Sequence, residues 1–397
     1  MTESPTGPTG DVGTHADRGV STLELFFDLV FVFGITQVTA YLSDDHSPLG
    51  FLQGLLLLVL LWWAWVGYAW LGTTADLRDG GIRFAIFTAM AGILVVAIGM
   101  PEWFADDPGG FDGTLPAPLI VAVAYVVVRL ANMAIYWRVA GGDRDLLRAV
   151  GRLSMSIALA GAFVIVGALF GGTTQLVLVG LAVLIDLAGP LVGRGAGWVV
   201  SPGHFAERHG LIVIIALGES IVAIGVGAAG AALSAPIVVA AAAGVAVAGR
   251  LWMLYFDSND TALEHSLKRR SGAAQAEQAR DVYSYLHLVM VAGIVLIALG
   301  LKKVLFEVAE YGWGHALPGY AAVAFAVGVA LFVLSRQFMR LRSGLAADGW
   351  SWVAAATAIV LAGAGFVLPA VVTALAGFLT LHIARAAVPA DSAHADA

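Results

Sequence analysis

Long runs of apolar residues recur along almost the whole chain, starting at Leu23. A helix of about 20 apolar residues is long enough to cross the hydrocarbon core of a bilayer. Of the 397 residues, 59% are hydrophobic and only 12% are charged, whereas a soluble domain carries about 25% charged residues. Because backbone polar groups must be satisfied within the bilayer, the sequence predicts an all-α polytopic membrane protein.

Twelve of these runs have roughly the length of a membrane crossing. They fall at 23–42, 51–72, 82–100, 117–139, 153–171, 174–193, 207–229, 234–256, 283–301, 317–335, 350–364 and 366–385. The last two come from one stretch, "WSWVAAATAIVLAGAGFVLPAVVTALAGFLTLHIAR", which is too long for a single crossing. Its centre, "GAGFVLP", has the composition of a tight turn. We therefore divide the stretch and predict about 12 transmembrane helices.

Basic residues indicate the orientation of these helices. If the N-terminus is cytoplasmic, nearly all arginines fall in cytoplasmic segments, and only Lys302 and Lys303 fall in outside loops. The basic segments Arg336–Arg342 and Arg385 flank the last two runs, which requires an even number of crossings between them. The pattern predicts a multi-pass protein of the plasma membrane with both termini in the cytoplasm.

The two halves of the chain resemble each other. "AGILVVAIG" (Ala91–Gly99) matches "AGIVLIALG" (Ala292–Gly300) without a gap, and each lies in the third predicted helix of its half. "LWWAW" and "LWMLY" lie in the second helices, and Glu24 and Glu207 open the first. Because these matches keep a common order, we infer a duplication of six helices. Six is even, so the two repeats would be parallel in the membrane.

Domain boundaries follow from this duplication. We expect a disordered N-terminal tail at 1–20, a first six-helix repeat at 21–200, a second at 201–386 and a disordered C-terminal tail at 387–397. The second repeat contains a long polar segment, 257–281, which we expect to be a cytoplasmic loop with a short helix.

Common signatures of a catalytic or metal centre are missing from the sequence. It has no cysteine, no P-loop and no His-Glu-x-x-His pattern. His204 and His209 are five residues apart, about 140° around a helix, which is a poor geometry for one metal ion. We predict no catalytic residue, metal, cofactor or nucleic-acid partner. The expected partners are the lipid bilayer and a small cation, proton or solute, and a homo-oligomer is left open.

Two long motifs resemble a known family. "LELFFDLVFVFGITQVT" and "HFAERHGLIVIIALGESIVAIG" are similar to the two best-marked segments of the bacterial low temperature requirement A (LtrA) family. They occur in the expected order on the first and seventh helices, and the resemblance covers about residues 20 to 385. It implies a bacterial multi-span membrane protein. The family name describes growth in the cold and implies no chemistry.

A weaker resemblance concerns the first helix alone. The pattern Asp28-x-Val30-Phe31-x-x-x-Ile35-Thr36 is similar to the first-helix motif of the two-repeat, six-helix-per-repeat potassium channels of lysosomes and bacteria. Those channels carry Phe-Ser-Asp where this chain has Phe-Phe-Asp, and the first helix of each repeat lines their pore. This resemblance implies a pathway along the first and seventh helices.

Polar and ionisable side chains inside the apolar helices are the candidate functional residues. A charge at the bilayer centre costs at least about 2.5–3.5 kcal/mol, so each such group needs a partner or a watery cavity. Glu219 follows Glu207 by 12 residues, or about 18 Å along a helix, which places it near the bilayer middle. The predicted ion or solute pathway consists of Glu24, Asp28, Thr36, Gln37, Glu219 and Ser220.

Other polar groups in the helices are predicted to be buried charge partners. These are Arg129, Asn132, Asp186, Glu207 and Arg250. Glu24 and Asp28 are four residues apart and therefore share one face of a helix. From their depth, we expect these two acids to pair with Arg129 and Arg250 across the bundle interior. Such pairs could serve a pathway or simply hold helices together.

Three functions agree with these features. The first is a transporter or channel for a small ion or solute that uses the buried carboxylates. The second is a membrane-embedded enzyme acting on lipid, and the third is a non-catalytic sensor or scaffold acting through 257–281. The buried acids and the lack of a catalytic domain favour transport over enzymatic activity. No residue names the substrate or explains growth in the cold.

Overall fold

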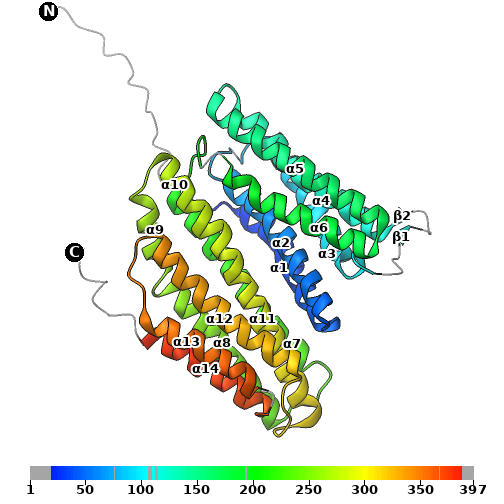
Figure 1. The fold of residues 1–397 in the computed structure, drawn as a ribbon, viewed down its shortest axis with the longest axis vertical. Coiled ribbons are helices and arrows are strands. Elements are labelled where there is room, and N and C mark those ends of the chain that lie inside the picture. The colour runs from blue at the N-terminus through cyan, green and yellow to red at the C-terminus, as the bar shows by residue number, and fades with distance from the viewer. Residues whose placement is uncertain are drawn as a thin grey trace, which may run out of the picture.

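The apolar runs form helices in the computed structural model of the chain (Figure 1). The structure describes residues 19–75, 77–105, 110–111, 115–192, 195–365 and 367–386. The apolar helices of the first half are α1 (Thr22–Asp44), α2 (Pro48–Leu71), α3 (Gly80–Gly99), α4 (Ala117–Ala140), α5 (Arg144–Phe170) and α6 (Gly172–Ala188). Those of the second half are α7 (Pro202–Gly227), α8 (Ala235–Phe256), α11 (His287–Tyr311), α12 (Gly319–Arg342), α13 (Gly349–Ala364) and α14 (Ala370–Ala386).

Short elements connect these helices. They are the single turns η1 (Met100–Glu102) and η2 (Gly189–Leu191), the antiparallel strand pair β1 (Gly110–Phe111) and β2 (Leu115–Pro116), the helices α9 (Asp260–Lys268) and α10 (Gly272–Gln278), and the π-helical segment η3 (Ala279–Leu286). The polar segment 257–281 thus holds two short helices rather than the one expected, and η3 continues directly into α11.

The prediction of a multi-pass, all-helical membrane protein is confirmed. Among the described residues, ten helices are long and apolar enough to cross a bilayer, judged by length and composition. The apolar helices α13 and α14 are shorter; α13 ends at Ala364 and α14 begins at Ala370, so the last long stretch is divided as predicted. The predicted disordered tails, 1–20 and 387–397, lie outside the described residues except for Gly19 and Val20.

The outer surface of the helices is apolar. Phe84 on α3 is 74% exposed, and Met155 and Phe170 on α5 are 72% and 73% exposed. Exposure of such large side chains would be costly in water, but hydrocarbon is their natural environment. These faces therefore fit contact with lipid.

The helices of each half pack in a closed order. In the first half, α1 packs against α2 and α3, α3 against α4, α4 against α5, α5 against α6, and α6 against α2. In the second half, α7 packs against α8 and α11, α11 against α12, α12 against α13, α13 against α14, and α14 against α8. The order of neighbours is the same in both series when α9 and α10 are left aside.

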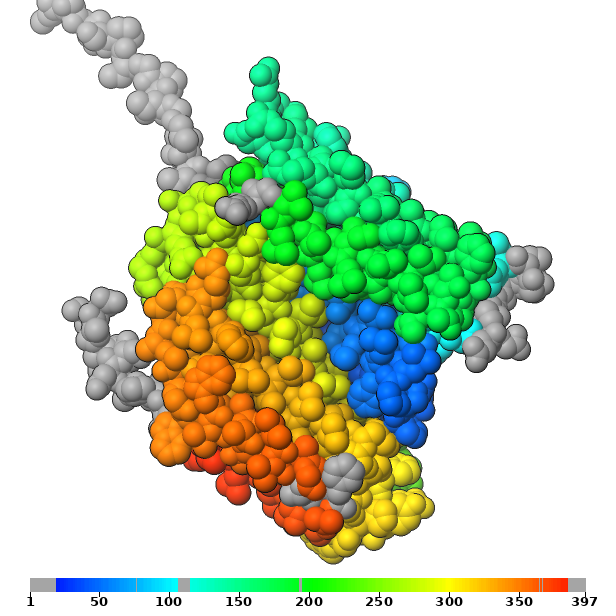
Figure 2. All heavy atoms as spheres, in the orientation of Figure 1, coloured from blue at the N-terminus to red at the C-terminus, as the bar shows by residue number. Residues whose placement is uncertain are grey.

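The two halves meet through α1 and α2 on one side and α7 and α11 on the other. In the space-filling view, the blue N-terminal helices lie between the green α6 region and the yellow and orange second half (Figure 2). Trp62 Nε1 on α2 donates to the Ser284 carbonyl at 2.8 Å, and Trp70 Nε1 donates to Ser284 Oγ at 2.9 Å. The π-helical segment is therefore part of the join between the halves.

A glycine contact lets α11 and α12 approach closely. A Cβ added to Gly293 would lie 2.8 Å from the Gly328 carbonyl oxygen, and one added to Gly328 would lie 2.6 Å from the Gly293 carbonyl oxygen. Real Cβ atoms are not found this close to backbone oxygen. Packing between these two helices therefore requires glycine at both positions.

We predict that Gly293→Ala destabilises the protein by about 1–3 kcal/mol, because the added methyl group forces α11 and α12 apart. Unfolding by a denaturing detergent or by heat, in purified protein, measures the change. Gly249→Ala on α8 is the matched control, since a Cβ there meets no atom within 4 Å. Equal stability of the two variants would contradict the close glycine contact.

Candidate functional site

The helices α1 and α7 lie side by side and are connected by polar side chains. Three contacts join them: His204 Nε2 lies 2.9 Å from Glu24 Oε1, Arg208 Nη2 donates to Asp28 Oδ1 at 3.0 Å, and Thr36 Oγ1 donates to Glu219 Oε2 at 2.6 Å. The contacts occur in the same order along both helices, so α1 and α7 run in the same direction. We call these six residues the α1–α7 seam.

At the N-terminal end of the seam, Glu24 caps α1 and also contacts α7. Its Oε2 accepts hydrogen bonds from Ser21 N at 2.9 Å and Ser21 Oγ at 2.8 Å, and the Ser21 hydroxyl accepts from Glu24 N. This reciprocal pattern is a capping box, which starts α1. Its other oxygen, Oε1, faces His204 and lies 4.0 Å from Arg208 Nη1. The acid therefore both begins the helix and ties it to α7.

One turn deeper, Asp28 and Arg208 form a buried ion pair. Each residue is 1% exposed. Trp65 Nε1 on α2 also donates to Asp28 Oδ1 at 2.9 Å, and the Arg208 guanidinium lies 5.5 Å from the centre of a Trp65 ring. Asp28 Oδ2 and Arg208 Nη1 have no hydrogen-bond partner among the described residues. The pair thus keeps polar capacity that its protein neighbours do not use.

At the other end of the seam, Glu219 has a neutral partner. The residue is 3% exposed, and its Oε2 accepts a hydrogen bond from the Thr36 hydroxyl. Within the part of the chain that the structure describes, no Lys, Arg or His nitrogen lies within 4.0 Å of its carboxylate. The adjacent Ser220 is fully buried, and its hydroxyl has no partner among the same residues. Gln37 is partly buried on α1.

The expected pairing of Glu24 and Asp28 with Arg129 and Arg250 is wrong. Arg129 Nη2 instead donates to Asp186 Oδ1 at 3.1 Å, inside the first half. Further contacts of these groups are Arg129 Nη1 to the Trp63 carbonyl at 2.8 Å, Tyr125 OH to Asp186 Oδ2 at 3.2 Å, and Arg250 to His382 and the Phe378 ring in the second half. Each arginine therefore finds its partners within its own six-helix group.

Arg208 is the partner that the sequence reasoning missed. The sequence placed the start of the seventh helix at 207, so Arg208 counted as a cytoplasmic flank. In the structure α7 begins at Pro202, and Arg208 lies more than one turn inside it. His204 and Arg208 are four residues apart, as are Glu24 and Asp28, and this shared spacing could have indicated that the two pairs face each other.

Glu207 is not a buried charge partner. It is exposed, and its Oε2 accepts a hydrogen bond from Val20 N at 3.0 Å. Successive residues of a helix point about 100° apart, so Glu207 faces away when Arg208 faces the seam. Asn132 is buried as predicted, at 4% exposure, but it lies on α4 away from the seam.

A cluster of histidines and aromatic residues lies next to the seam. The His209 and His287 rings are 5.2 Å apart, and Tyr283 stacks on His287 at 5.1 Å. His287 Nε2 is 2.8 Å from the Tyr255 hydroxyl, and His209 meets Trp65 edge to face. The rings of this cluster pack against one another. The described residues contain no group of three or more side chains able to hold a metal ion.

The chemistry available at the seam is that of carboxylates in apolar surroundings. The seam contains three carboxylates, those of Glu24, Asp28 and Glu219. Among its six residues only Arg208 carries a permanent positive charge. Thr36 follows Glu24 by 12 residues, so the contacts extend over about 18 Å of the helix axis. A buried carboxylate without a cation either holds a proton or attracts a positive ion.

Comparison with known proteins gives a family and a relative. The family model for bacterial low temperature requirement A protein (LtrA) matches residues 19–386. The chain is also similar to "Uncharacterized protein RA0937" of Rhizobium meliloti (strain 1021), at 29% identity over 301 residues that cover 70% of this chain and 67% of that protein. No solved structure matches the chain.

We predict that Asp28→Asn destabilises the folded protein by about 3–5 kcal/mol, because the Arg208 guanidinium loses its carboxylate while it stays buried. Detergent-induced or thermal unfolding of the purified variant measures this loss. The double variant Asp28→Leu with Arg208→Met removes both charges and should be more stable than Asp28→Asn. An Asp28→Asn variant as stable as the wild type would show that Arg208 does not depend on this pair.

Proposed function

This chain belongs to the bacterial low temperature requirement A (LtrA) family, and we propose that it is a transporter or channel that moves a proton or small cation along the α1–α7 seam. The observation that carries the proposal is the position of Glu219. Its carboxylate lies deep in α7, is 3% exposed, and accepts a hydrogen bond from the neutral Thr36 hydroxyl. An ionisable group in such a place is a functional candidate because its charge is expensive to keep without a counterion.

The order of groups along the seam supports this proposal. Glu24 and Asp28 lie next to His204 and Arg208, and Glu219 lies beyond them with hydroxyl groups as neighbours. Among the described residues no cationic side chain forms an ion pair with Glu219, so a cation that reaches it would not compete with an arginine. Thr36, Ser220 and Gln37 would then offer uncharged oxygen atoms to it.

A duplicated architecture also supports the proposal. We propose that 21–200 and 201–386 are parallel six-helix repeats with both termini in the cytoplasm of the cell membrane. The shared order of helix neighbours and the common direction of α1 and α7 agree with this arrangement. In transporters built from repeats, substrate sites lie at the repeat interface, and α1 and α7 are the equivalent first helices there.

We expect Glu219→Gln to lower cation flux at least about tenfold, which corresponds to about 1.4 kcal/mol on the transport barrier. Proteoliposomes with imposed H⁺, Na⁺ or K⁺ gradients provide the measurement, and a single elution peak in size exclusion checks the fold. The variant keeps the shape of the side chain and its hydrogen bond from Thr36, so loss of flux would reflect loss of the ionisable group.

Glu307→Gln on α11 is the matched control. Glu307 is also buried, at 5% exposure, but it binds His315 at 2.7 Å rather than a residue of the seam. Flux should be kept in this variant. Equal flux in wild type and Glu219→Gln would contradict the role of Glu219, and absence of flux for every cation with folded wild-type protein would contradict the proposed function.

A further inference from the structure

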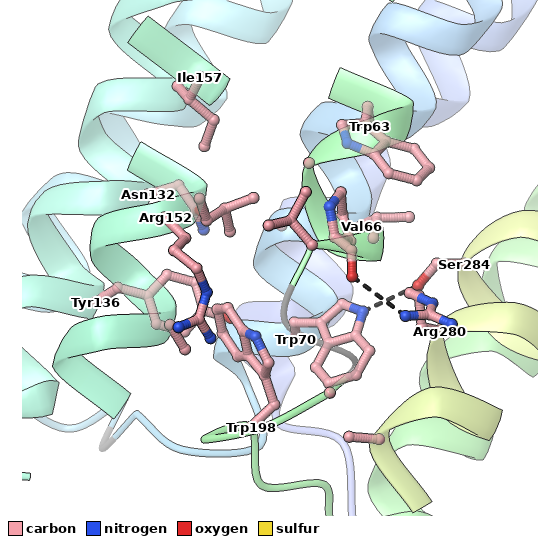
Figure 3. A pocket seen from close by; sticks show the side chains of 18 of the residues that line it. Trp63, Val66, Trp70, Asn132, Tyr136, Arg152, Ile157, Trp198, Arg280 and Ser284 are labelled. Atoms are coloured by element: carbon pink, nitrogen blue, oxygen red, sulfur yellow. Dashed lines mark hydrogen bonds between the residues drawn. The ribbon is translucent and has the colours of Figure 1, made fainter. Parts of the chain in front are cut away.

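A pocket lies between helices of the first half and the α10–η3 segment of the second half, outside the seam, and neither the family nor the proposed pathway assigns it a role (Figure 3). Its walls come from α2, α4 and α5, from residues 189–192 and 195–198, and from α10 and the π-helical segment η3. It contains about 730 Å³ of space not filled by atoms, its open mouth included.

Three hydrogen-bond donors at this pocket have no acceptor. They are Asn132 Nδ2, Tyr136 OH and Arg152 Nε, and none has a partner among the described residues. Asn132 is 4% exposed and Tyr136 is 1% exposed. Figure 3 shows the three side chains gathered on the α4 and α5 side of the pocket. Since a buried donor without an acceptor is costly, this wall is suited to a ligand with several acceptor oxygens.

The charge of the lining favours an anion. It includes three arginines and no Asp or Glu among the described residues. Arg129 pairs with Asp186, and Arg280 pairs with Asp281, which also pairs with Arg342; both acids lie outside the lining. In the described part of the chain, Arg152 has no carboxylate within 4.0 Å, and its Nη2 donates to the Ala196 carbonyl at 3.4 Å. The Arg152 guanidinium therefore leaves the pocket with a net positive charge.

Most of the remaining lining is apolar, and it includes the tryptophans Trp63, Trp70 and Trp198. Trp198 packs edge to face against Trp70 and Tyr136, with ring centres 5.8 Å and 5.3 Å apart. Trp63 and Ile157 lie at the opposite end of the pocket from Trp198, and Arg152 lies between these ends (Figure 3). The charged wall is thus next to a surface that can bury a hydrocarbon or aromatic group.

We propose that this pocket binds an amphipathic anion. Its phosphate or carboxylate accepts hydrogen bonds from Arg152, Tyr136 and Asn132, and its apolar part packs against the tryptophans and aliphatic side chains. An ionised acceptor strengthens each of these hydrogen bonds, and the guanidinium fits an oxyanion with two donors. An anionic lipid and a free organic acid share this chemistry.

Binding can be measured by the change in tryptophan fluorescence of the full-length protein in a neutral detergent, because three of its 11 tryptophans line the pocket. The probes are dioctanoyl phosphatidylglycerol, octanoate and inorganic phosphate, with dioctanoyl phosphatidylcholine as the zwitterionic comparison. We expect saturable binding of at least one of the two amphipathic anions, and weak binding of inorganic phosphate. Tighter binding of phosphatidylglycerol would identify a lipid as the source of the anion, and tighter binding of octanoate would identify a free acid.

Variants locate the binding to this pocket. Arg152→Gln should lower the affinity for the anion about tenfold, and Tyr136→Phe should lower it several-fold, since each removes a charge-assisted hydrogen bond. Tyr136→Phe keeps the ring that packs on Trp198, so the fold is preserved. Arg148→Gln, one turn earlier on α5, is the matched control, because Arg148 is exposed, pairs with Asp145 and does not line the pocket.

Three results would overturn the proposal. The first is that neither amphipathic anion binds in the millimolar range. The second is that phosphatidylcholine binds as tightly as phosphatidylglycerol and octanoate. The third is that the Arg152→Gln and Tyr136→Phe variants bind the anion as tightly as the wild type does. Because the readout is binding and not flux, each of these results is independent of whether the α1–α7 seam carries ions.

Discussion

The ion pair between Asp28 and Arg208 is the contact on which the join between the two halves depends. Both side chains are removed from solvent, so their mutual attraction must offset the cost of desolvating two charges. Trp65 supports the pair by donating to the same carboxylate oxygen and by lying against the guanidinium. If α1 moved away from α7, each charge would be left alone in an apolar interior. This cost holds the two helices in one register.

The partners of the carboxylates differ between the two ends of the seam. At the N-terminal end, acids and bases are matched and the helices are held together. At Glu219 the neighbours are hydroxyl groups, so the carboxylate keeps its capacity for a proton or a cation. The proposed ion pathway rests on this arrangement, in which a matched charged end lies next to a buried carboxylate with a neutral hydrogen-bond partner. The tryptophan bonds to Ser284 hold α2 against the second half beside it.

The helices could be predicted from the sequence, but several partners could not. Apolar runs mark spans because lipid leaves the backbone few alternatives to helix, and "GAGFVLP" marked the separation of α13 from α14. Arg208 was missed because α7 begins five residues before its apolar run, at Pro202. Glu207 was wrongly predicted to be buried, because neighbouring residues on a helix face different directions and only Arg208 faces the seam. The pocket could not be predicted, because its lining comes from elements far apart in the chain.

The sequence by itself determined the all-helical, multi-pass architecture, the family, and the presence of acids on the first and seventh helices. Those properties depend on local composition and on spacing along one helix. Only the tertiary structure decided which arginine neutralises which acid, that Glu219 meets a threonine, and that Asn132, Tyr136 and Arg152 face one cavity. A buried charge pairs with the group that packing brings within hydrogen-bond distance. The spacing of residues along one helix does not determine which distant helix packs against it.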